Sequence, residues 1–150
     1  MVALDESLSH LIINGAAMSY LRILGTAVIL AFVAHPAHAE DPQPIVTPAL
    51  LKNLDDLPGK EVLMITVDYP PGTVEHVHRH DAHAFVYVLE GTIVMQVRGG
   101  KELTLTPGQT FYEGPKDVHT VGRNASKTKP AKFVVVLLKN KGVDAVLPAQ

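Results

Sequence analysis

The sequence predicts an all-β domain, a sandwich or barrel of short antiparallel strands. Eight segments rich in strand-forming residues recur about every ten residues between Glu61 and Lys139. Gly or Pro stands at nearly every break between these segments, as short strand-to-strand turns require. No stretch after residue 40 shows sustained helical periodicity. The 150 residues suffice for one domain of ordinary size.

Nearly every expected strand ends at a turn signal. Pro70-Pro71-Gly72 closes the first strand, and Gly99-Gly100 separates the fourth from the fifth. The segments alternate or are continuously apolar, which is typical of half-buried and buried strands. The eight expected strands are Glu61–Tyr69, Val74–His80, Phe85–Leu89, Thr92–Arg98, Glu102–Thr106, Gln109–Glu113, Val118–Val121 and Lys132–Lys139.

Residues 1–39 are expected to be a signal peptide and not part of the fold. From Met18 a basic start precedes the apolar run Ile23–Ala34 and the small-residue end Ala37-His38-Ala39. The run is shorter than the about 20 apolar residues that a membrane span needs. Cleavage before Glu40 would release a periplasmic or secreted domain, and Met18 is the expected true start. An uncleaved anchor or a buried helix is the alternative interpretation.

The mature chain is expected to begin with an arm and continue as one domain. Residues 40–60 contain four prolines, which predicts an extended arm with at most one short turn around Ala49–Leu54. Residues 61–150 contain all the expected strands and form the predicted domain.

Composition excludes several classes of function. With 13 Lys+Arg against 15 Asp+Glu, the chain lacks the basic surface that nucleic-acid phosphates require. The absence of Cys removes disulfides, thiolate metal sites and thiol nucleophiles. Eight histidines are the strongest compositional signal, and four of them fall within residues 76–83.

The histidine tract indicates a metal site. On a strand, His76, His78 and His80 share one face, and alternate imidazoles about 7 Å apart can bind one ion. An exposed polar strand face is the alternative for a single His-x-His pair. Three imidazoles on a buried face are costly unless they are hydrogen-bonded or bind something, so a metal explains the tract better.

The order of residues resembles the cupin family. Gly72-x5-His78-x-His80-x3-Ala84-x6-Gly91 follows the first cupin motif, and Gly108 through His119 and Asn124 approximates the second. The resemblance covers about residues 60–140 and implies a cupin-type jelly-roll β-barrel, or double-stranded β-helix. The chain departs from the motifs at four positions: Ala84 replaces the acidic ligand, Gly114 the proline and Lys116 the glycine, and Asn124 lies one residue late.

The resemblance implies that His78, His80 and His119 bind one divalent metal ion, for which Fe, Mn, Zn, Ni and Cu all suit imidazole ligands. Because Ala84 leaves the acidic position vacant, the fourth ligand stays open. His83 is the first candidate, followed by Glu113, His76 and water. Glu113 is also the candidate catalytic base.

The implied function is that of an exported single-domain cupin that holds a metal and acts on a small oxygen-rich molecule, as a dioxygenase or an isomerase. A non-catalytic metal- or ligand-binding module is the second hypothesis, and a metal-free sugar pocket is the third. The expected partners are a small-molecule ligand or substrate and a second copy of the chain, paired through the arm. Neither nucleic-acid binding nor stable membrane insertion of the mature chain is expected.

Overall fold

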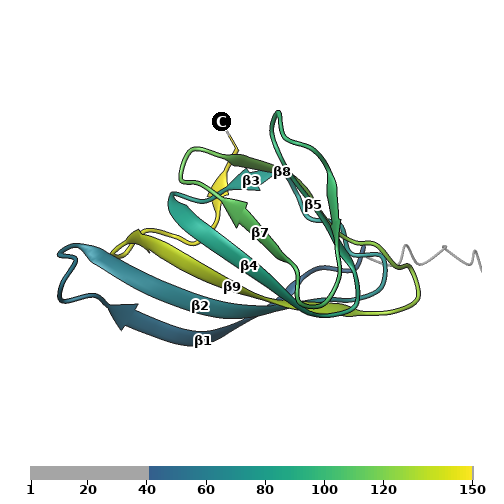
Figure 1. The fold of residues 1–150 in the computed structure, drawn as a ribbon, viewed down its shortest axis with the longest axis horizontal. Coiled ribbons are helices and arrows are strands. Elements are labelled where there is room, and N and C mark those ends of the chain that lie inside the picture. The colour runs from purple at the N-terminus through teal and green to yellow at the C-terminus, as the bar shows by residue number, and fades with distance from the viewer. Residues whose placement is uncertain (1–40, 150) are drawn as a thin grey trace, which may run out of the picture. The chain divides into compact units, whose positions relative to one another are not determined.

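The structure, a computed structural model, describes residues 41–149 (Figure 1), so the expected signal peptide lies outside the described residues. The prediction of an all-β fold is confirmed, since the described chain forms strands and turns and contains no helix. Accordingly, no helix in residues 41–149 is long and apolar enough to cross a membrane. The strands are β1 (Ile45–Asn53), β2 (Lys60–Tyr69), β3 (His78–Arg79), β4 (Ala82–Glu90), β5 (Ile93–Val97), β6 (Leu103–Leu105), β7 (Thr110–Glu113), β8 (Val118–Asn124), β9 (Ala131–Asn140) and β10 (Leu147–Pro148).

The strands form two five-stranded sheets whose paired neighbours run antiparallel (Figure 1). One sheet has the order β1-β2-β9-β4-β7 and the other the order β10-β3-β8-β5-β6. Strands far apart in the sequence are paired throughout, as β2 with β9 and β3 with β8. This arrangement agrees with the predicted jelly-roll, in which the chain passes repeatedly between the two sheets.

The core is built from alternate residues of the strands. In β4 and β9 buried positions alternate with more exposed ones, as expected for strands with one face on the core. Tyr69 of β2 packs edge-to-face on Phe133 of β9, with ring centroids 4.8 Å apart. Ile93 and Met95 of β5 contribute from the other sheet. The core therefore joins the two sheets.

The N-terminal arm forms a strand. Ile45–Asn53 pairs with β2 as the edge strand β1, with a register shift between Pro48 and Leu50. All nine of its residues are exposed, which agrees with Pro48 being tolerated at a sheet edge. The turn expected around Ala49–Leu54 is misplaced, because pairing with β2 extends through Asn53 and the chain turns only at residues 55–59.

The expected strand Val74–His80 is mostly irregular. Only β3 remains a strand, while Val74 forms an isolated bridge with Arg123. Pairing needs a partner strand, and β8 offers residues 118 and 119 to β3. The short strand β10, which pairs with β3, was not anticipated.

The turn at Glu90-Gly91 fixes the end of β4 next to the start of β9. Gly91 has φ +72°, and a Cβ there would lie 2.5 Å from the Pro130 carbonyl oxygen and 2.7 Å from Ala131 Cα. Both obstacles are backbone atoms, so this position requires glycine for space as well as for conformation.

Candidate metal centre

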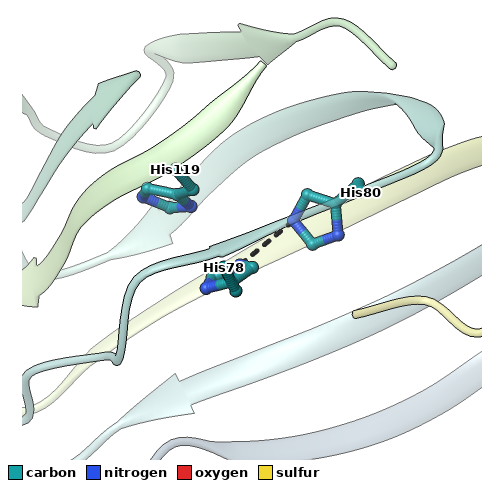
Figure 2. Close-up of side chains that lie close together, drawn as sticks. All are labelled: His78, His80 and His119. Carbon is teal, nitrogen blue, oxygen red and sulfur yellow. Dashed lines mark hydrogen bonds between the residues drawn. The ribbon is translucent and has the colours of Figure 1, made fainter. Parts of the chain in front are cut away.

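Three histidines from two distant segments of the chain lie close together (Figure 2). His78 on β3 and His119 on β8 are register partners, which places their rings side by side, with centroids 4.9 Å apart. His80, two residues after His78, has its ring centroid 4.8 Å from that of His78. One nitrogen from each ring lies within 4.8 Å of the others. The structure thus brings together the three predicted ligands.

Backbone carbonyls fix which nitrogen of each ring carries a proton. His78 Nδ1 faces the His76 carbonyl at 2.9 Å, His80 Nδ1 faces the Ala145 carbonyl, and His119 Nε2 faces the Val121 carbonyl at 2.6 Å. Because a carbonyl oxygen can only accept, each of these nitrogens is the donor. The remaining nitrogens, which are Nε2 of His78, Nε2 of His80 and Nδ1 of His119, carry lone pairs when the rings are neutral.

A cation would satisfy these lone pairs. The Nε2 atoms of His78 and His80 lie 3.2 Å apart, so with both Nδ1 protons donated elsewhere two lone pairs face each other (Figure 2). Nδ1 of His119 is buried without a hydrogen-bond partner. Two donors bound at about 2.0–2.1 Å to one ion lie roughly 2.8–3.4 Å apart at octahedral or tetrahedral angles. The residues present therefore fit a divalent metal ion.

A carboxylate completes the cluster from the neighbouring strand. Glu113 ends β7 and is the register partner of Ala84 on β4. Its Oε1 lies 3.3 Å from His119 Nδ1, and its Oε2 lies 3.9 Å from His80 Nε2. Oε2 is buried without a hydrogen-bond partner. Glu113 thus places an acidic group where Ala84 leaves the motif without one.

The electrostatics of the cluster favour its uncharged forms. Burial, reinforced by the charge of His78, lowers the pKa of His119 to about 4. Burial also lowers the pKa of His80. Burial, together with the nearby carboxylate of Glu75, raises the pKa of Glu113 to about 8. Neutral imidazoles are the ligand form, so burial prepares the histidines to bind metal.

His83 and His76 lie elsewhere. His83 is exposed, and its Nδ1 lies 2.7 Å from the Tyr112 hydroxyl. Strand parity puts it on the opposite face of β4 from Ala84, and β4 shows no bulge at this point. The structure therefore does not bring His83 to the three histidines. His76 is exposed at the edge of the cavity, and its carbonyl, not its ring, contacts His78.

Three contributors to the site were missed in the sequence. Ala145 supplies the carbonyl that orients His80, and β10 holds this C-terminal segment against β3. Glu75 lines the cavity through a side chain that no motif singles out. Gly122 makes room, since a Cβ there would lie 2.5 Å from Glu75 Oε2 and 3.1 Å from His119 Nε2. A backbone carbonyl is present at every residue, and the close approach of two strands depends on the fold. Neither feature can therefore be recognised in the sequence.

The cluster forms one wall of a cavity of about 520 Å³. The opposite wall is apolar and comes mainly from β2 and β9, with Val46 and Pro48 of β1 at its edge. This volume lies within the roughly 300–1,000 Å³ of small-molecule sites. The arrangement can therefore hold a small ligand beside a metal ion.

Comparison with known proteins agrees with this architecture. The family profile described as a cupin domain (Cupin_2) matches residues 65–137. No curated protein matches the sequence of this chain.

Several solved structures share the fold. A conserved double-stranded β-helix protein from Klebsiella pneumoniae subsp. pneumoniae MGH 78578 is 20% identical with TM-score 0.58, over 74% of this chain and 90% of that one. A cupin domain from Bordetella pertussis Tohama I is 24% identical with TM-score 0.51, over 67% of this chain and 98% of that one.

The DMSP lyase DddQ of Ruegeria pomeroyi DSS-3 is 19% identical with TM-score 0.52, over 59% of this chain. This chain spans 43% of the length of that lyase. At these identities the likeness concerns the fold alone. The profile match thus shows that residues 65–137 are similar to the cupin domain, and the solved structures show that the described chain shares the double-stranded β-helix fold of cupins.

Proposed function

We propose that this chain is a metal-dependent enzyme for a small-molecule substrate, with His78, His80 and His119 holding one divalent ion. The observation that carries the proposal is that one nitrogen of each of the three rings lies within 4.8 Å of the others, while each ring also donates a hydrogen bond from one nitrogen to a backbone carbonyl. Such outer contacts fix the tautomer and orientation of metal-binding histidines. The facing Nε2 atoms of His78 and His80 support a cation between them.

Glu113 is proposed as the carboxylate beside the ion, in the place of the acidic residue that Ala84 lacks. Its Oε1 is 3.3 Å from His119 Nδ1, a distance that two ligands of one ion share. Its other oxygen, Oε2, is buried and unpartnered, and a bound cation would favour the ionised carboxylate, so Oε2 could then accept a proton from a bound substrate. Glu113 thereby combines the ligand role and the base role.

The proposed chemistry is proton removal from an oxygen-bearing substrate. When bound, a divalent ion supplies Lewis acidity, which lowers the pKa of a substrate hydroxyl or of a carbon next to a carbonyl. Glu113 Oε2 then receives the proton, while the apolar wall excludes water from the pair. Isomerisation and reaction of an enol with dioxygen both begin with this step, so isomerase and dioxygenase are the proposed reaction classes.

The first test is the metal content of the full chain purified without an affinity tag. We expect about one ion per chain in the wild type and a large loss in His78→Ala and His119→Ala. Absence of stoichiometric metal in the wild type overturns the proposal. The hypothesis of a metal-free sugar pocket would then remain.

The second test is turnover. Candidate enols and flavonoids are screened by dioxygen uptake and by NMR for isomerisation. Glu113→Gln keeps an oxygen donor and loses the basic Oε2, so it should lower kcat by roughly 10²–10⁴-fold while metal stays bound. A protein that holds metal and turns over none of these compounds would support the non-catalytic binding module.

We also propose that the domain acts in the periplasm or outside the cell. The support is the apolar run Ile23–Ala34 followed by Ala37-His38-Ala39, which has the length and end of a secretion signal. N-terminal sequencing of the native protein should find Glu40. Finding Met1 or Met18 instead contradicts export with cleavage.

A further inference from the structure

The cavity wall opposite the metal centre offers almost no polar partner. It is formed by six apolar side chains of β2 and β9, namely Leu63, Ile65, Val67, Phe133, Val135 and Leu137. A ligand rich in hydroxyls would leave those groups without hydrogen bonds against this wall, at a substantial free-energy cost for each buried group. The wall therefore disfavours sugars and other polyols.

The cavity also disfavours strongly anionic ligands. Its described lining contains no Lys or Arg, whereas Glu75 and Glu113 both face it. Phosphate recognition depends on Arg, Lys or clustered backbone N–H donors. A phosphorylated ligand would meet two carboxylates and one metal ion, without a second positive group to balance its charge.

One side of the cavity thus favours oxygen donors and the other favours hydrocarbon. The three histidines and Glu113 lie together at one wall, and Val46 of β1, which is 54% exposed, lies at the edge of the apolar wall. A ligand that satisfies both sides needs its metal-binding oxygens at one end and an uncharged apolar body behind them.

We infer that the cavity binds small molecules with a chelating oxygen pair at one end and an uncharged apolar body, and discriminates against sugars and phosphorylated compounds. This inference rests on the proposed metal centre and adds the substrate class. The apolar wall of β2 and β9 excludes sugars and phosphorylated compounds, and the metal ion selects the chelating oxygen pair.

The test uses straight-chain hydroxamic acids, from acetohydroxamic to octanohydroxamic acid, as probes of one head group and a variable tail. The full chain is loaded with Co²⁺, its metal content is measured, and binding is followed by calorimetry and by the visible spectrum of the metal. Affinity should rise about fourfold for each added methylene that enters the cavity, the transfer free energy of one buried CH₂. A tail of equal length that ends in a carboxylate should lose this gain.

Two variants on neighbouring residues of β1 locate the effect. Val46→Asp puts a charge at the apolar wall without burying it fully, whereas Thr47→Asp puts the same charge on a residue outside the cavity lining. Val46→Asp should abolish the dependence of affinity on tail length. Thr47→Asp should behave as the wild type.

The outcomes separate this inference from the proposed function. A loaded protein whose affinity is indifferent to tail length, or that binds the carboxylate-ended tail equally well, overturns the substrate class and leaves the metal centre standing. A chain that retains no Co²⁺ and binds no hydroxamate overturns the metal centre itself, and the substrate class with it.

Discussion

Ala84 on β4 and Glu113 on β7 are register partners with buried side chains, and Glu113 Oε1 lies 3.3 Å from His119 Nδ1. Directly opposed residues of an antiparallel pair lie on the same face, with Cβ atoms about 4.5–5.5 Å apart. A carboxylate can therefore move from one strand to the other and still reach the same ion. The acidic position of the first cupin motif is vacant at Ala84, and we propose that Glu113 compensates for it from the neighbouring strand.

The first prediction follows from this pairing. Glu113→Ala should weaken metal binding by roughly 10–100-fold, the range seen when groups around a metal are removed. Ala84→Glu in the Glu113→Ala background should restore much of the affinity, because the carboxylate returns from the partner strand. Competition with a chromogenic chelator measures both variants, with Glu90→Ala on the exposed end of β4 as control. A double variant as weak as Glu113→Ala contradicts the compensation.

The second prediction concerns metal and stability. His78 and His119 come from β3 and β8, so an ion between them joins two distant parts of the chain. A metal at a hundredfold excess over its Kd stabilises the folded chain by about 2.7 kcal/mol. Removing it with a chelator should lower Tm by roughly 10 °C for a domain of this size.

His119→Ala should remove this response, and the exposed His83→Ala should keep it. Differential scanning calorimetry with and without chelator distinguishes them. Equal responses of the two variants would assign the stabilisation to some other site.

The third prediction concerns pH in the metal-free protein. Burial raises the pKa of Glu113 to about 8 from an ordinary 4.5, so above pH 4.5 the unfolded chain releases a proton that the folded chain keeps. Glu113 therefore lowers stability as pH rises toward 8. His119, with its pKa lowered to about 4 from 6.5, lowers stability as pH falls through that window. The effects of these two groups offset each other between pH 4.5 and 6.5, and of the two only Glu113 acts from pH 6.5 to 8. Burial also raises the pKa of Glu75, which acts in the same direction as Glu113.

The Tm of chelator-treated wild type should accordingly fall from pH 6.5 to 8, and Glu113→Gln should flatten the profile. Metal should also flatten it, because a nearby cation favours the ionised carboxylate. The measurement is a thermal melt at half-unit pH steps. Parallel profiles for wild type and Glu113→Gln would show that Glu113 does not titrate in this range.

The fourth prediction concerns Gly122. A Cβ at this position would press on Glu75 Oε2 at 2.5 Å and on the His119 ring at 3.1 Å. The Glu75 carboxylate can swing away, but the ring is held by the Val121 carbonyl. Gly122→Ala should therefore lower metal affinity more than it lowers stability. Metal titration and thermal melts of the chelated protein separate the two, with Gly100→Ala as a distant control; a loss of stability alone would leave the site unaffected.

The fifth prediction concerns assembly. We propose that two copies of this chain pair through β1, as the resemblance to single-domain cupins implies. In support, β1 is an edge strand exposed along its whole length, with large apolar side chains such as Ile45 and Leu51 at 57% and 62% exposure. Unpaired strand edges readily add a further strand.

Light scattering at micromolar concentration should give the mass of a dimer. Leu51→Lys should shift it toward the monomer, while Leu103→Lys on the other sheet's edge should not. A monomeric wild type contradicts the proposal.

The strands and the three histidines could be predicted because their signals are local. Runs of strand-forming residues between Gly and Pro breaks predict β2, β4, β5 and β9. The turn residues that end these strands are their immediate neighbours in the sequence. The metal-ligand set followed from the resemblance, since its motifs keep a fixed order and spacing. His78 and His80 share a cluster in the structure, although most of their expected strand is irregular.

Tertiary structure alone decided how the site is completed. The approach of Glu113 to the place beside Ala84 depends on the register of β4 against β7, which is set by the packing of the whole sheet. The orientation of His80 depends on a carbonyl 65 residues away at Ala145, and β1 became a strand because β2 offered it an edge. Such contacts join residues far apart in the sequence, so they arise only when the chain closes on itself, whereas strand and turn preferences are properties of neighbouring residues.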